Sequence, residues 1–279
     1  MSQIRLPDNL VQYVTRDLLR RAEIIQLAPD AVREIAPALL PQHELQAAYS
    51  DAALQQWLLT TEAKPAEKKS ILQKLNPFAS NHTVQYVMPE NFSAQNQQAN
   101  PAKLVLASFA LDVLSAGQSM EWLEYMPAWF AAEGVLLFAT LGAGALPELI
   151  NQDEQWLAHV SHLPSIMNMG RRLQDLRFGL PVLDVETVRL GYEAPELMWQ
   201  DVLGISPSLQ NLTESEQNHW RERLYQTFEN GLRQLSLEVM YGQVWQPTAE
   251  PLASGVQTIS LESLTASLKN RSTHEGDAG

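Results

Sequence analysis

The chain lacks cysteine altogether, carries few cations and has no glycine among its first 116 residues. Without cysteine it can form no disulfide, thiolate metal site or cysteine nucleophile. Lys and Arg number 19 against 32 Asp and Glu, which gives a net charge of −13. Because acidic surfaces repel phosphate backbones and anionic lipids, this composition argues against a nucleic-acid or membrane partner.

Long apolar segments are also missing. The longest apolar run spans residues 135–146 and is broken by Gly142 and Gly144, whereas a membrane span needs about 20 residues. The first ten residues contain no apolar segment of the kind found in secretion signals. At 45% hydrophobic and 18% charged residues the balance is that of an ordinary globular domain. We therefore predict a soluble, cytoplasmic protein.

The distribution of glycine excludes one kind of ligand site. All 13 glycines lie at or after Gly117. Loops that bind phosphates or dinucleotides need glycine, because their backbone takes positive φ angles and approaches the ligand closely. The N-terminal region therefore holds no glycine-rich nucleotide loop. A helix-rich region that does not require glycine is the alternative explanation of the same count.

Apolar patterning predicts an α/β domain over residues 1–247. Helical spacing favours a helix over 10–27, and residues 51–60 are also predicted to be helical. Continuous or alternating apolar runs predict strands over 31–35, 83–87, 104–109, 135–140, 181–189 and 236–245. Strands that are apolar on both faces and separated by helices indicate a largely parallel sheet covered on both sides. Polar stretches at 62–81 and 91–101 are predicted loops or insertions, and 248–279 is a predicted disordered tail.

Common catalytic motifs are absent. Two pairs of side chains could in principle hold a metal or transfer protons, and a simpler explanation is favoured for each. His159 and His162 have a spacing that can hold a metal, but no third ligand lies nearby in sequence, so a surface pair is favoured and no metal site is predicted. Asp184 and Glu186 share one strand face, where a solvated pair is favoured over acid–base catalysis.

One glycine pair follows a predicted strand. Gly142 and Gly144 superficially resemble the start of a dinucleotide fingerprint, but Pro147 stands where the third glycine should be. A proline at the first position of the next helix explains this turn without any ligand.

The order of several segments resembles a known family. Residues 106–114 (LASFALDVL) and 133–142 (EGVLLFATLG) are similar to the second half of class I S-adenosylmethionine methyltransferases. Residues 165–202 and the segment 238–247 (EVMYGQVWQP) resemble BioC, the malonyl-carrier-protein O-methyltransferase of biotin synthesis. A related arginine hydroxylase of complex I assembly shares the fold. The resemblance covers residues 8–247 and implies a Rossmann-like class I methyltransferase sheet, mostly parallel, with an antiparallel strand near the C-terminus and helices on both faces.

The chain departs from this family where the family binds its cofactor. There the first strand ends in an acidic residue followed by Gly-x-Gly-x-Gly, against which the methionine and ribose rest. Here Glu34 keeps the acid, but the three glycines are replaced by Ala36, Ala38 and Leu40, and Pro37 stiffens the turn. Each Cβ makes positive φ costly, by roughly 1 kcal/mol or more.

The other cofactor positions are carried over by alignment with the same family. Tyr49 falls where a carboxylate should end the second strand, with Asp51 two positions on as a substitute. Glu90 matches the acidic residue after the third strand. An active site would be lined by Glu34, Asp51, Glu90 and Ser108.

Three functions are compatible with this pattern. The first is a methyltransferase-fold protein with a degenerate S-adenosylmethionine site, acting as a non-catalytic binding, scaffold or regulatory protein. The second is an active O-methyltransferase that binds S-adenosylmethionine through an unusual loop. The third is an unrelated α/β binding protein.

The resemblance also implies partners. A carrier protein or a true methyltransferase is expected to bind the substrate side, with Arg171, Arg172, Arg177, Tyr241 and Trp245 as candidate contacts. Because carrier proteins are themselves acidic, only a local basic patch such as the three arginines could attract one.

Overall fold

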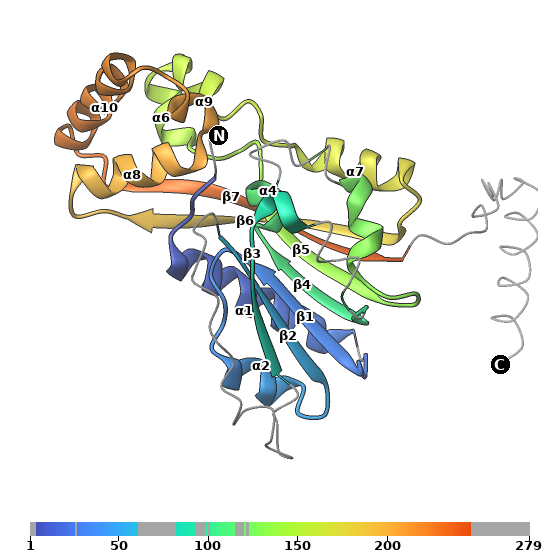
Figure 1. Ribbon diagram of the computed structural model, residues 1–279. Coiled ribbons are helices and arrows are strands. Elements are labelled where there is room, and N and C mark those ends of the chain that lie inside the picture. The colour runs from blue at the N-terminus through green and yellow to red at the C-terminus, as the bar shows by residue number, and fades with distance from the viewer. Residues whose placement is uncertain are drawn as a thin grey trace, which may run out of the picture. The chain divides into compact units, whose positions relative to one another are not determined.

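A computed structural model gives the fold (Figure 1). Met1–Pro247 and Thr248–Gly279 form two separate units. The structure describes residues 4–25, 27–60, 82–92, 99, 101–114, 120 and 123–246. The predicted tail, the segment 62–81 and most of 91–101 lie outside these ranges and stay predictions.

The centre of the first unit is a seven-stranded sheet in the order β3-β2-β1-β4-β5-β7-β6. Strands β1 to β5 are parallel to one another, and β7 runs antiparallel between β5 and β6. This order, with its single reversed strand, is that of class I methyltransferases, so the predicted fold class is confirmed. The strands are β1 (Ala31–Ala36), β2 (Ala53–Leu59), β3 (His82–Val87), β4 (Leu104–Ser108), β5 (Val135–Leu141), β6 (Gly179–Gly191) and β7 (Gln234–Trp245).

The central strands are buried along their whole length. Every residue of β1, β4 and β5 is buried, as expected for parallel strands covered by helices on both faces. The edge strand β6 has no fully buried residue. Burial therefore falls from the middle of the sheet to this edge.

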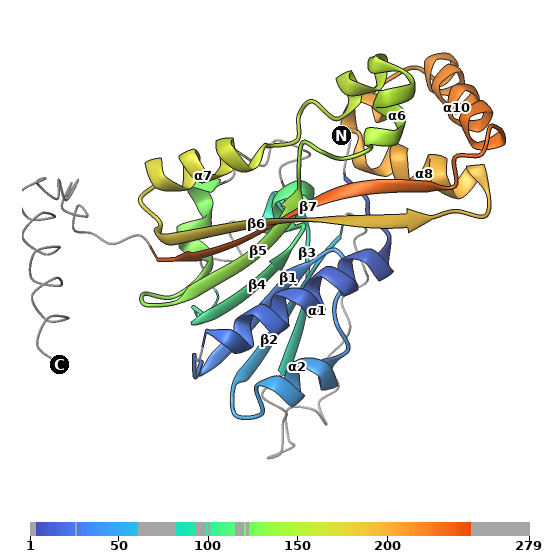
Figure 2. The ribbon, with the colours of Figure 1, turned by 180° about the vertical axis from the view of Figure 1, so that it is seen from behind.

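Helices cover both faces of the sheet. Helix α1 (Asp8–Ile24) begins directly after Pro7 and lies against β4 and β5, as Figure 2 shows. The short helix α2 (Gln42–Ala48) follows β1. Among the described residues the other helical segments are η2 (Pro89–Asn91), α4 (Ala110–Leu114), η3 (Leu123–Trp129), α6 (Pro147–Gln152), η4 (Glu154–His159), α7 (Ile166–Asp175), α8 (Pro195–Ile205), α9 (Pro207–Gln210) and α10 (Glu214–Glu229).

Strands β6 and β7 form a long ribbon that carries a helical insertion. Helices α8, α9 and α10 lie between the two strands in sequence and gather at one end of the ribbon (Figure 1). A capping box at Thr213 and Glu216 fixes the start of α10. The insertion contacts the rest of the domain where α9 packs against η4, which follows β5 and α6 in the sequence.

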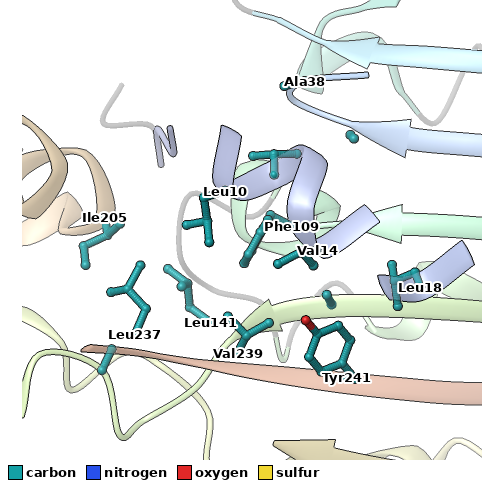
Figure 3. Packing of buried hydrophobic residues seen from close by; sticks show 14 of the residues in the cluster. Leu10, Val14, Leu18, Ala38, Phe109, Leu141, Ile205, Leu237, Val239 and Tyr241 are labelled. Carbon is teal, nitrogen blue, oxygen red and sulfur yellow. The ribbon is translucent and has the colours of Figure 1, made fainter. Parts of the chain in front are cut away.

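The sheet separates two apolar clusters. One joins α1 to the loop after β1 and to β4, β5 and β7, and Figure 3 shows Leu10, Val14, Phe109 and Tyr241 of this cluster. The other, on the opposite face, includes Trp57, Trp129 and Phe138. Two apolar faces on one sheet explain why its central strands read as unbroken apolar runs.

One predicted element is wrong. Residues 51–60 were expected to form a helix, but Ala53–Leu59 is strand β2, paired with β1 on one side and β3 on the other. The segment has no β-branched residue, so its local preference is helical, and burial of Trp57 and Leu59 in the sheet overrides it. Among the described residues no helix has the length and apolarity to cross a membrane.

Candidate cofactor site at the carboxyl edge of the sheet

Glu34 lies within β1, two residues before its end, and is fully buried. Its Oε1 accepts a hydrogen bond of 2.8 Å from the backbone N–H of Leu40, and its Oε2 accepts one of 2.5 Å from Gln56 Nε2. The same Gln56 amide nitrogen donates to the Leu40 carbonyl at 2.8 Å. Glu34 and Gln56 are register partners on β1 and β2. Both carboxyl oxygens therefore hold the loop 37–40 against the sheet.

Burial dominates the electrostatics of this carboxyl group. Loss of hydration raises the pKa of Glu34 to about 7, and the bonds from Gln56 and Leu40 only partly offset that rise. His82 Nε2 lies 2.7 Å from Gln56 Oε1 and extends the polar cluster to β3. This buried cluster joins three neighbouring strands beneath the loop.

The end of β1 and the loop after it place apolar side chains at the three positions where the resemblance leads us to expect glycines. Ala36 is fully buried, and Ala38 and Leu40 are 6% and 3% exposed. Ala38 and Leu40 belong to the same buried cluster as Phe109 and Leu10, and Ala38 and Phe109 are both seen in Figure 3. The expected crowding by these side chains is thus matched by their burial in the core.

The end of β4 is also buried, in this case against α1. Ser108 is fully buried, and its hydroxyl is 2.6 Å from the Thr15 hydroxyl on α1. The next residue, Phe109, has a left-handed backbone with φ of 51°, and its N–H donates to the Ala139 carbonyl at 2.8 Å. The turn directs the Phe109 ring under α1, where the ring is fully buried.

The two positions expected at the end of β2 are misplaced. Tyr49 caps α2 and Asp51 lies in the following turn, so both precede β2 rather than follow it. They sit at the amino end of that strand, away from the carboxyl edge, because 53–59 is a strand and not a helix. The carboxyl end of β2 is Leu58-Leu59-Thr60 and carries no acid. Glu90 follows β3 in η2, but its side chain is outside the described part of the chain.

Sequence reasoning missed Asp112. This residue of α4 is fully buried, and its Oδ1 accepts hydrogen bonds from Thr140 Oγ1 at 2.9 Å and from the Leu141 N–H at 3.3 Å. Its Oδ2 has no partner. Burial raises the pKa of Asp112 to about 7. An acid inside an apolar stretch directly after a strand was the available signal.

The glycine turn after β5 has a structural role. A Cβ at Gly142 or Gly144 would lie 2.3 or 2.5 Å from a carboxyl oxygen of Glu238. The Gly144 N–H also donates to Glu238 Oε1 at 3.2 Å. Pro147 occupies the first position of α6, as expected. Both glycines therefore make room for a side chain of β7.

Among the described residues, neither the histidine pair nor the strand carboxylates belong to a group of three side chains that could hold a metal. His159 accepts or donates to Ser208 Oγ at 2.9 Å and packs edge-on against Trp220, whereas His162 Nε2 is buried without a partner. No group of three metal-binding side chains occurs among the described residues. Asp184 and Glu186 instead bind side chains of α1.

The candidate partner residues fall on two surfaces. Arg171 and Arg172 lie on α7, with Arg172 paired to Glu124 of η3, and Arg177 stands exposed in a left-handed turn before β6. Tyr241 and Trp245 lie on β7 and pack against the cluster beneath α1. The structure therefore does not bring the arginines and the two aromatic residues into one site.

Sequence comparisons relate the chain to curated methyltransferases. It is 26% identical to the malonyl-[acyl-carrier protein] O-methyltransferase of Methylovorus sp. (strain MP688), over 86% of this chain and 83% of the relative. It is 29% identical to the protein of that name from Laribacter hongkongensis (strain HLHK9), over 55% of this chain and 57% of the relative. The protein of that name from Legionella pneumophila subsp. pneumophila (strain Philadelphia 1 / ATCC 33152 / DSM 7513) is 28% identical, over 57% and 62%. The latter two alignments span only about six tenths of the relatives. No protein-family model matches the chain.

The solved structures that are similar to the chain share little sequence with it. A cyclopropane-fatty-acyl-phospholipid synthase-like protein from Lactobacillus casei ATCC 334 is 15% identical, with a TM-score of 0.47 over 88% of this chain and 96% of that one. Phosphoethanolamine N-methyltransferase 2 from Haemonchus contortus is 8% identical, with a TM-score of 0.44 over 84% and 53%. The fold assignment rests on the strand order, not on these scores. The chain has the class I methyltransferase fold, and its curated homologues bear the name malonyl-[acyl-carrier protein] O-methyltransferase.

Proposed function

We propose that this protein is a methyltransferase-fold protein that has lost its S-adenosylmethionine site and works as a non-catalytic binding, scaffold or regulatory protein. The observation that carries this proposal is the closure of the loop after β1 onto Glu34. The Leu40 amide and Gln56 occupy both oxygens of that carboxyl group. A cofactor would have to displace these bonds as well as the buried side chains of Ala38 and Leu40.

Two further features support the loss of the site. Among the described residues, which stop here at residue 60, the end of β2 offers leucines and a threonine where the resemblance requires a carboxylate for the ribose hydroxyls. The fully buried Phe109 ring follows β4 and lies in the same cluster as Ala38. These residues do not fit S-adenosylmethionine, since removing them from the core would expose apolar surface at about 25 cal/mol per Å².

Titration calorimetry with S-adenosylmethionine and S-adenosylhomocysteine tests the proposal. We expect no binding with a Kd below about 100 μM, which corresponds to roughly 5.5 kcal/mol. The same titration into an active methyltransferase serves as the positive control. Tighter binding to this chain would contradict the proposal and favour the alternative, an active O-methyltransferase with an unusual cofactor loop.

The relatives' name gives that alternative its own test. The curated homologues are named for methylation of a malonyl-carrier protein. Incubation of the chain with S-adenosylmethionine and malonyl-carrier protein, followed by mass spectrometry, should show no mass increase on the malonyl group. A methyl ester formed at a rate above the protein-free control would establish the active alternative.

We further propose a carrier protein, or a methyltransferase that acts on one, as the partner. Arg171 and Arg177 are exposed on and after α7, and these cations would attract an acidic carrier despite the net charge of −13. Charge reversal by Arg171→Glu with Arg177→Glu should weaken carrier binding, measured by calorimetry. Asp175→Lys on the same helix is the matched control and should not weaken it. Equal binding by both variants would rule out this docking surface. The cytoplasmic location and the absence of nucleic-acid and membrane partners remain predictions.

A further inference from the structure

A pocket opens between the last turns of α1 and the ribbon of β6 and β7. Its volume is about 200 Å³. An engineered apolar cavity of about 150 Å³ holds benzene, so this pocket has room for one six-membered ring or a short branched chain. The residues that enclose it come from α1 (Leu18, Arg21, Ile24, Ile25), β5 (Leu137), β6 (Val182, Asp184) and β7 (Tyr241, Gly242, Gln243).

The floor of the pocket is apolar and fixed. Leu18, Leu137 and Tyr241 are 0%, 1% and 2% exposed, and the last two lie on the neighbouring strands β5 and β7. The lip is apolar as well but faces solvent, with Ile24 79% and Val182 57% exposed. A ligand that covers this lip would remove exposed apolar surface from water, which favours binding by about 25 cal/mol per Å².

One side of the pocket is polar and is lined by Arg21 and Asp184, with Asp17 bound to Arg21 just outside the lining. The Arg21 guanidinium stacks 4.2 Å from the centre of the Tyr241 ring and donates to both Asp17 and Asp184. Two carboxylates thus share one cation. Asp184 keeps 58% of its side chain exposed, so its oxygens remain accessible beside the apolar floor.

A second carboxylate lies farther along the same strand face. Glu186 accepts hydrogen bonds from the Tyr13 hydroxyl at 3.0 Å and from the Tyr241 hydroxyl at 3.1 Å. These two bonds join α1 to the ribbon and hold Tyr241 in place as the pocket wall. Burial, and then Glu186, raise the pKa of Tyr241, so the phenol stays neutral. Tyr241 therefore adds no charge of its own to the pocket.

We propose that this pocket binds a small organic cation, in which an ammonium group is attached to an apolar group the size of one ring. The apolar group fills the space above Leu18 and Leu137, and the ammonium pairs with Asp184. An anion is disfavoured because Asp17 and Asp184 already surround Arg21. The site lies beneath α1 and shares no residue with the loop after β1, so it does not depend on the proposed loss of the cofactor site.

Three compounds of one shape and different charge test the proposal. Benzylammonium, benzyl alcohol and benzoate are titrated into the full chain, and binding is followed by amide chemical shifts. We expect saturable shifts at Gly242 and Gln243, with benzylammonium binding about threefold more tightly than the alcohol, as for an exposed ion pair. Benzoate should bind most weakly. Absence of saturable shifts with all three compounds, or tightest binding by benzoate, would overturn the proposal.

Two pairs of variants locate the site. Asp184→Asn should remove the preference for benzylammonium over benzyl alcohol, whereas Asp175→Asn on α7 should keep it. Val182→Trp should fill the pocket and abolish all shifts. Val185→Trp changes the same strand but points to its other face, because side chains alternate along a strand, and should leave binding unchanged.

Calorimetry of the cofactor distinguishes this proposal from the proposed function. Benzylammonium binding together with S-adenosylmethionine binding would support the pocket and contradict the loss of the cofactor site. If Val182→Trp does not fold, the comparison of Asp184→Asn with Asp175→Asn decides alone. Retention of the cation preference in Asp184→Asn would show that the ammonium does not pair there and would overturn the assignment.

Discussion

The turns after β1 and β5 differ in how the space beside them is filled. Both follow a fully buried parallel strand and lead into a short helix. After β5, Gly142 and Gly144 leave room for Glu238 of β7. After β1, Ala38 and Leu40 fill the space with side chains of their own. Glycine is present where a protein side chain needs the space and is absent from the turn where we propose that a cofactor site has been lost.

The largest expected effect comes from introducing glycines at the end of β1 and in the turn after it. Ala36→Gly, Ala38→Gly and Leu40→Gly together should lower the free energy of unfolding by about 5 kcal/mol, mostly because the Leu40 side chain leaves the core. Urea unfolding measures this loss. Leu40→Ala alone should account for about 3 kcal/mol of it. A loss below about 1 kcal/mol in the triple variant would show that the turn does not contribute to the core.

The converse change in the C-terminal half should cost somewhat less. A Cβ at Gly242 would lie 2.1 Å from a ring carbon of Phe138, in the closely packed core between β5 and β7. Gly242→Ala should therefore lower the free energy of unfolding by about 3 kcal/mol. Gly191→Ala is the control, since nothing lies within 4 Å of a Cβ there. Equal costs for both variants would contradict the packing account.

The next prediction concerns proton binding by Asp112, which lies in α4 and is hydrogen-bonded to β5. Its pKa rises from 3.8 to about 7 because it is buried. The folded state therefore holds the proton more tightly than the unfolded state, and this stabilisation is lost as pH rises through about 7. Between pH 4 and 7, the free energy of unfolding of Asp112→Asn should therefore rise relative to that of the wild type, by up to about 1.4 kcal/mol per pH unit.

Urea unfolding at pH 4, 5, 6 and 7 measures that difference, with Asp175→Asn as an exposed control. The buried Glu34, whose pKa is also about 7, titrates in both proteins and cancels in the comparison. A difference that does not change with pH would place a charged Asp112 in the folded state.

The smallest expected effect concerns the ion pair between Arg16 of α1 and Glu44 of α2. Arg16 Nε and Nη2 donate to the two Glu44 oxygens at 2.7 and 2.8 Å, with both side chains partly exposed. Arg16→Ala should lower the free energy of unfolding by less than about 1 kcal/mol, and 1 M salt should shrink the loss further. A larger loss that salt leaves unchanged would mean that the arginine contributes through packing.

The fold could be predicted from the sequence because its central strands are apolar on both faces. The runs at 104–109 and 135–140 differ from β4 and β5 by a residue at most. Strand β2 was missed since Ala53–Leu59 has the local preference of a helix and becomes a strand only through its two neighbours. Local preference cannot reveal pairing between segments that are distant in the sequence.

The same missed strand explains the errors at the site. Glu34 and the loop 37–40 were found because Glu34 lies in β1 and the loop follows that strand directly. Tyr49 and Asp51 were assigned to the wrong end of β2, and Gln56, the partner of Glu34, was not foreseen. The contact between Glu34 and Gln56 depends on the register of β1 against β2, which no local pattern of residues contains.

The ribbon of β6 and β7 has a consequence for how this protein can change. Gly191 and Gln234 face each other across the ribbon, so the chain leaves the sheet and returns to it at a single point. A change in the length of the segment 192–233 therefore leaves the register of β6 and β7 intact, as long as Val202, Ile205 and Leu209 still pack in the core. A different helical segment joined at this point would have to cover the same apolar surface of the domain.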